Sequence, residues 1–179
     1  KEIKFMNALL IMGYTNFELG IFKASDPKIT VIKKAFRKRL ESYLAQGLQW
    51  VIFTGALGFE YWALEEAKTM QKDFDFEIAT LFDFETHGKN WNEANQQKLE
   101  IFKSVNFVKA AYETYENPSQ FRQYHAFLIE NTQGALLFYD DENETKLHFL
   151  IDKMKQTPDY RLDFITFENL QETYEEMNE

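Results

Sequence analysis

The stretch that decides the fold is Trp50-Val51-Ile52-Phe53-Thr54-Gly55-Ala56-Leu57-Gly58-Phe59-Glu60-Tyr61-Trp62. An apolar β-type run ends at Thr54, a tight Gly-x-x-Gly turn follows, and a helical pattern begins at once. This order is typical of nucleotide sites in α/β proteins. Glycine lets a phosphate or ribose approach the main chain, and the start of a helix offers free amide groups. Glu60 would bind a ribose hydroxyl or simply interact with the helix dipole. The same spacing is also ordinary turn chemistry.

Length and composition indicate one acidic α/β domain. A chain of 179 residues can bury a sizeable core without disulfide bonds or a structural metal. The absence of cysteine fits a reducing cytoplasm. The formal net charge of −9 and the isoelectric point near 4.9 argue against a nucleic-acid or anionic-membrane partner. No apolar run has the length of a membrane span, and no signal-peptide pattern opens the chain.

Outward from the central stretch, strands and helices alternate along the chain. Apolar runs predict strands at residues 8–12, 50–54, 77–82, 106–112, 134–139 and 163–166. Helical patterns are predicted near residues 26–46, 59–73, 93–104, 117–131, 146–155 and 168–177. The alternation predicts a doubly wound, mainly parallel sheet with helices on both faces, a Rossmann-like fold. We expect a single domain over 6–179, with 1–5 as a tag remnant or N-terminal extension.

One helix, after the Asp26–Pro27 start, carries a run of cations on the face opposite its apolar residues. We interpret that face as solvated helix surface. A nucleic-acid patch is the alternative, and the acidity of the chain counts against it. Its members are Lys33, Lys34, Arg37, Lys38 and Arg39.

Four motifs together resemble a known family. They are Gly13-Tyr14 with Phe17-Glu18-Leu19-Gly20, Gly55-Ala56-Leu57-Gly58-Phe59-Glu60 with Trp62, Lys89-Asn90-Trp91, and Tyr115-Glu116-Asn117-Pro118-Ser119-Gln120-Phe121. Their order and spacing resemble the YpsA family of Gram-positive bacteria, a branch of the superfamily that includes DprA and the LOG phosphoribohydrolases. The resemblance implies a Rossmann-like fold and a site for a nucleotide or an ADP-ribose-type ligand. It also implies a role in division or stress physiology, without an established reaction.

The chain departs from the family pattern in three places. Thr15 stands where relatives often carry a basic residue, and His125 stands where an Asn is expected. After Asp140 the chain reads Asp141-Glu142-Asn143-Glu144-Thr145-Lys146 in place of a Gly-Ser step. These changes weaken two expected phosphate contacts, and the clustered carboxylates repel a phosphate unless a cation intervenes.

Ligands of parallel sheets collect beyond the carboxyl ends of the strands. The loops predicted there, together with the helix start at Gln120, supply our candidate ligand-binding residues. Tyr14 and Trp91 could stack on a base or fill the packing layer, and Gln120 could bind a base edge or cap its own helix. Trp62 is expected in the core. The candidates are Gly13, Tyr14, Gly55, Gly58, Glu60, Asn90, Trp91, Gln120 and Asp140.

Three functions remain open at this stage. The first is a nucleotide-binding protein, and the superfamily resemblance is compatible with a homodimer. The second is an enzyme that cleaves an N-glycosidic bond with Glu60 as its carboxylate, and the third is a protein-interaction module with no ligand. His87, His125 and His148 show no paired metal spacing, and no nucleophile-elbow motif occurs. We therefore expect neither a metal site nor a hydrolase triad.

Overall fold

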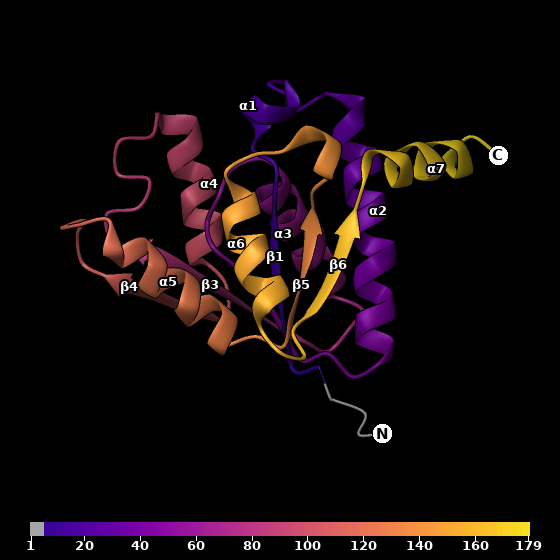
Figure 1. Ribbon diagram of the computed structural model, residues 1–179. Coiled ribbons are helices and arrows are strands. Elements are labelled where there is room, and N and C mark those ends of the chain that lie inside the picture. Colours follow the sequence, from indigo (N-terminus) through magenta and orange to yellow (C-terminus); the bar gives the residue numbers. More distant parts are fainter. Residues whose placement is uncertain (1–5) are drawn as a thin grey trace.

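Every strand pairing in the central sheet is parallel. The computed structural model describes residues 6–179, and in this range the sheet has six strands in the order β4-β3-β2-β1-β5-β6 (Figure 1). The central strands consist of uninterrupted apolar residues because helices cover both faces of the sheet. The strands are β1 Ala8–Gly13, β2 Trp50–Phe53, β3 Glu77–Phe84, β4 Phe107–Tyr112, β5 Gly134–Phe138 and β6 Arg161–Ile165.

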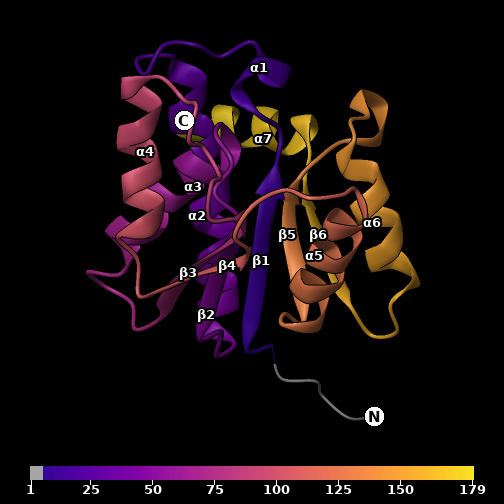
Figure 2. The same ribbon diagram turned by 90° about the vertical axis from the view of Figure 1, so that its left-hand side faces the viewer.

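Helices connect the strands on both sides of this sheet. Figure 2 shows α5 and α6 on the near face, with α2, α3 and α7 behind it, and α4 packs beside α3. The predicted doubly wound α/β fold is therefore confirmed. The helices are α1 Asn16–Leu19, α2 Pro27–Ala45, α3 Phe59–Met70, α4 Glu93–Lys103, α5 Ser119–Glu130, α6 Leu147–Gln156 and α7 Phe167–Met177, with a 3-10 turn, η1, at Asp141–Asn143.

Several boundaries differ from the sequence-based ones for local reasons. The loop expected after β1 contains the short helix α1, because Thr15 and Glu18 form a reciprocal capping box. Strand β3 continues to Phe84, two residues beyond the prediction, while α3 ends at Met70, three residues before it. Trp62 is buried in the core as expected. The segment 1–5, interpreted as an extension, lies outside the described residues.

Helix α2 begins as predicted, with the Asp26 side chain accepting a hydrogen bond from the Lys28 amide and Pro27 in the first turn. Four of the five cations in its basic run form ion pairs with acidic residues of neighbouring elements: Lys33–Glu65, Arg37–Glu66, Lys38–Glu176 and Arg39–Asp163. The basic helix is thus part of the α2–α3 and α2–α7 packing. Across residues 6–179, no helix is long and apolar enough to cross a membrane.

Candidate functional site

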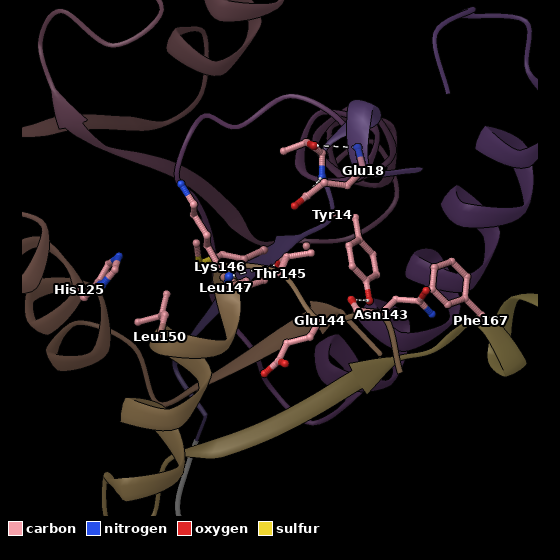
Figure 3. A pocket seen from close by; sticks show the side chains of 13 residues that line it. Tyr14, Glu18, His125, Asn143, Glu144, Thr145, Lys146, Leu147, Leu150 and Phe167 are labelled. Atoms are coloured by element: carbon pink, nitrogen blue, oxygen red, sulfur yellow. Dashed lines mark hydrogen bonds between the residues drawn. The ribbon is translucent and has the colours of Figure 1, made fainter. Parts of the chain in front are cut away.

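A cavity of about 800 Å³ lies beyond the carboxyl ends of β1 and β5. The chain builds outward from β1 to β4 and then returns to place β5 on the other side of β1, so the strand order reverses between these two strands. Such a reversal opens a crevice because the two loops leave in opposite directions. In Figure 3, His125 and Leu150 lie on one side of the cavity, Tyr14 and Phe167 lie on the other, and residues 145–147 lie between them.

The first wall is the loop after β1, which begins at Gly13. A Cβ atom at Gly13 would lie 2.6 Å from the ring of Phe59 and 2.9 Å from the backbone oxygen of Phe138, so only glycine permits this close packing. The Thr15 amide donates to Glu18 Oε1 at 2.8 Å. This wall is therefore held rigidly against the core and the short helix α1.

Tyr14 joins the two walls. Its hydroxyl accepts from the Asp140 amide at 2.8 Å and lies 2.8 Å from the carbonyl oxygen of Asn143. Its ring is only 3% exposed and lies nearly parallel to the rings of Tyr139 and Phe167, with centroids 5.6 Å away in each case. The ring thus occupies the packing layer, which was the alternative to stacking on a base.

The second wall is the segment from Asn143 to Leu147 at the start of α6. Lys146 is the N-cap residue of this helix, and its cationic side chain lines the cavity beside the amide groups of the first turn. His125 of α5 completes the lining, and burial together with nearby Lys153 lowers the pKa of its imidazole. The imidazole is therefore neutral at pH 7 and has one donor and one acceptor nitrogen.

The departures from the family pattern meet in this cavity. Thr15, His125 and the stretch from Asn143 to Lys146 come from three separate parts of the chain and all line it. Glu18 and Glu144 also line the cavity, whereas Asp140, Asp141 and Glu142 do not. The Glu18 carboxylate accepts from the Thr15 amide, and Glu144 Oε1 lies 3.6 Å from His148 Nδ1. Of the clustered carboxylates between residues 140 and 144, which the sequence predicts to repel a phosphate, only Glu144 lines the cavity.

The Gly-x-x-Gly loop encloses a side chain of its own helix. The Glu60 carboxylate accepts hydrogen bonds from the Thr54 amide at 2.7 Å, the Gly55 amide at 3.2 Å and the Thr54 hydroxyl. Burial raises the pKa of Glu60 to about 7, and these hydrogen bonds oppose that shift. Glu60 is 2% exposed and is not among the residues that line the cavity. The amides of Thr54 and Gly55 are therefore already used within the protein.

His87 supports the same loop from the other side. Its Nε2 lies 2.8 Å from the Gly55 carbonyl oxygen, and its Nδ1 lies 3.2 Å from Asp83 Oδ1. Burial acts to lower the pKa of His87, but the hydrogen bonds to Asp83 and Gly55 outweigh it and raise the pKa. His87 thus supports the Gly-x-x-Gly loop through hydrogen bonds at both ring nitrogens.

The family follows from comparison with known proteins. Residues 9–170 match the YpsA family, described as the YspA SLOG family. The chain belongs to this family. It is 63% identical to the UPF0398 protein YfdB of Lactococcus lactis over 97% of the chain and all of that protein. It is 58% identical to a UPF0398 protein of Streptococcus agalactiae over 95% of the chain and 99% of that protein.

In this YpsA-family protein the predicted site residues fall into two groups. Gly13 and Tyr14 line the cavity, whereas the remaining candidates lie outside its lining, in the loops after β2, β3 and β5 and in the first turns of α3 and α5. Gln120 accepts from the Glu116 and Asn117 amides and donates to the Thr114 carbonyl oxygen, so it organises the start of its own helix. The other candidates away from the cavity lining are Gly55, Gly58, Glu60, Asn90, Trp91 and Asp140.

Two of these loop residues have local partners. Trp91 packs edge-on against His87, with ring centroids 5.2 Å apart. Asp140 accepts from the Glu142 amide and, at 3.4 Å, from the Phe167 amide at the start of α7. Glu18 and Lys146 line the cavity but were absent from our candidates. For Lys146 the available signal was its position at the expected start of a helix that follows a central strand.

Proposed function

We propose that this protein binds a small nucleotide-derived ligand, of the ADP-ribose type, in the cavity between β1 and β5. The observation that carries the proposal is the position and size of the cavity. It lies where the strand order reverses, and its volume of about 800 Å³ is within the range of small-molecule sites. Membership of the YpsA family, whose description places it among SLOG proteins, is consistent with this proposal.

The lining offers a complementary group for each part of such a ligand. Lys146 and the first turn of α6 suit a phosphate. The carboxylates of Glu18 and Glu144 can accept hydrogen bonds from ribose hydroxyls, and neutral His125 can both donate to and accept from a base. In this proposal Gly13 and Tyr14 shape the wall. A role in division or stress physiology would follow from sensing the ligand.

The hydrolase hypothesis receives less support from the geometry. It requires the Glu60 carboxylate to reach a glycosidic bond, but this group is 2% exposed and is held by the Thr54 and Gly55 amides. In the proposed function Glu60, Gly55 and Gly58 therefore act by shaping the loop that supports the site.

Calorimetric titration with ADP-ribose tests the proposal, with AMP and ribose 5-phosphate as smaller probes. Lys146→Gln should weaken ADP-ribose binding about tenfold, since one charge-assisted hydrogen bond contributes roughly 1.5 kcal/mol or more. Lys155→Gln is the matched control, because Lys155 lies in the last turn of the same helix. Equal affinities in both variants, or no heat from any of the three compounds, would show that the cavity is not a nucleotide site.

A further inference from the structure

Strand β4 leaves one edge of the sheet unpaired within residues 6–179. It pairs only with β3, and its first three residues, Phe107, Val108 and Lys109, are exposed. Phe107 is 49% exposed and Val108 is 39% exposed. An exposed apolar edge strand is a template for pairing with another strand.

The opposite edge of the sheet is protected in a way that β4 is not. Strand β6 carries two charged residues among its five, and Asp163 is bound by Arg39 and by the Tyr43 hydroxyl. The single charge of β4 belongs to Lys109, whose ammonium lies 5.7 Å from the ring centroid of Phe127 on α5. The Lys109 side chain thus packs against its own molecule. Charged residues usually prevent association at sheet edges, and β4 has little of that protection.

The outward backbone groups of β4 can be assigned to particular residues. The Tyr112 carbonyl accepts from the Glu85 amide, which continues β3, so Tyr112 directs its backbone groups toward β3. Because these groups alternate in direction along a strand, Phe107, Lys109 and Ala111 direct theirs away from the sheet.

Charges along the edge indicate what pairs with it. In the segment 107–115 the basic residue Lys109 lies in β4, and the acidic residue Glu113 directly follows the strand. Both side chains are exposed. Two antiparallel copies of this segment bring these opposite charges together. A two-fold axis at Ala111 would set Lys109 opposite Glu113 of the second copy, with the small Ala111 side chains at the centre.

We infer that β4 is a homodimer interface, in which two copies of this chain pair antiparallel through their β4 edges. The two sheets join into one, and the two-fold arrangement uses both free edges, so assembly stops at two copies. Exposed aromatic rings at both ends of the segment, Phe107 and Tyr115, would be covered by the same contact.

Sedimentation velocity over a concentration series tests this inference, with Ala111→Pro and Ala111→Ser compared. Proline at an outward-facing position of an edge strand removes no bond to β3 but abolishes the central intermolecular pair. The wild type and Ala111→Ser should sediment at twice the chain mass of 21.3 kDa, and folded Ala111→Pro at the single mass. A monomeric wild type, or a dimeric Ala111→Pro protein, would overturn the inference.

A second measurement keeps the inference testable if the proline variant does not fold. Amide hydrogen exchange in the wild type should show protection of Phe107, Lys109 and Ala111, which have no amide partner in an isolated copy. Lys109→Glu should weaken the dimer, and adding Glu113→Lys to the same chain should restore it. Rapid exchange at these three amides, or no recovery in the double variant, would count against pairing through β4.

Discussion

The carboxyl group of Glu60 is surrounded by the main chain of its own loop, with hydrogen bonds from the Thr54 and Gly55 amides. The Glu60 carboxyl group thus occupies the position in which the loop amides would otherwise bind the anionic group of a ligand. Because the group is buried, its neutral form is favoured, and its pKa rises to about 7 from an ordinary value of 4.5.

This raised pKa predicts a pH-dependent stability. A carboxyl group that binds its proton more tightly in the folded state stabilises the fold fully below about pH 4.5, and that contribution is lost as the pH rises to about 7. Relative to Glu60→Gln, the wild type should lose roughly 3 kcal/mol of unfolding free energy across this interval. Urea denaturation at several pH values measures the difference.

Two comparisons make that measurement specific. The raised pKa of His87 produces a loss of the same sign near neutral pH, and because the charge of Glu60 contributes to that pKa, both proteins are compared in a His87→Gln background. Glu100→Gln, on the exposed surface of α4, should follow the wild-type curve. Parallel wild-type and Glu60→Gln curves would mean that the carboxyl titrates normally.

Position 58 requires glycine because of both its backbone angles and the close approach of neighbouring atoms. Its φ is 89° and its ψ is −128°, and a Cβ atom there would lie 2.4 Å from the Asn16 amide nitrogen. Gly20, with a φ of 66°, has no atom within 4 Å of such a Cβ. Gly20→Ala should therefore cost about 1 kcal/mol, and Gly58→Ala more than about 2 kcal/mol. Chemical denaturation of both variants checks this order, and equal costs would contradict it.

At the scale of elements, Arg39 joins α2 to β6 and α7. Its guanidinium donates to Asp163 at 2.6 Å, to the Phe164 carbonyl oxygen at 2.9 Å and to Asn169 at 3.2 Å. Lysine could not reproduce this arrangement, because three acceptors in different directions require the planar fork of arginine. At least one residue of the basic run of α2 therefore holds this helix against β6 and α7.

Alanine substitutions of two adjacent cations of α2 should therefore lower the free energy of unfolding by very different amounts. Arg39→Ala should destabilise the fold by about 2 kcal/mol, since it leaves the partly buried carboxylate of Asp163 without its cationic partner. Lys38→Ala should cost less than about 0.5 kcal/mol, because its 3.4 Å pair with Glu176 is exposed. Thermal and urea unfolding of the two variants provide the test. A Lys38→Ala variant as unstable as Arg39→Ala would show that the ion pairs are equivalent.

At the scale of the whole molecule, one apolar core extends through the sheet and both helical layers. We therefore predict that residues 6–179 unfold as a single cooperative unit. Tryptophan fluorescence reports on β2, α3 and the loop after β3, through Trp50, Trp62 and Trp91. Its guanidinium transition should coincide with that of the far-ultraviolet circular dichroism signal. Two separated transitions would indicate independent folding units.

Local sequence sufficed to predict the six strands and the six longer helices of the described residues, and with them the fold class, whereas the short helix α1 was missed. Apolar runs such as that of β1 and capped starts such as Asp26–Pro27 depend on neighbours a few residues away, so their patterns can be recognised in the chain. The same holds for the burial of Trp62 and for the position of Gly13 and Tyr14 at the edge of the sheet.

Tertiary structure decided which residues line the cavity and which nearby polar groups are already bonded within the protein. Thr15, His125 and Lys146 are far apart in sequence and meet only because α5 returns the chain to the far side of β1. The role of Glu60 depends on whether the loop amides face outward or toward its carboxylate. The sequence spacing of Gly55, Gly58 and Glu60 is the same in both cases, so it does not distinguish them. Local propensity determines which elements form, whereas long-range packing determines which of their polar groups remain available to a ligand.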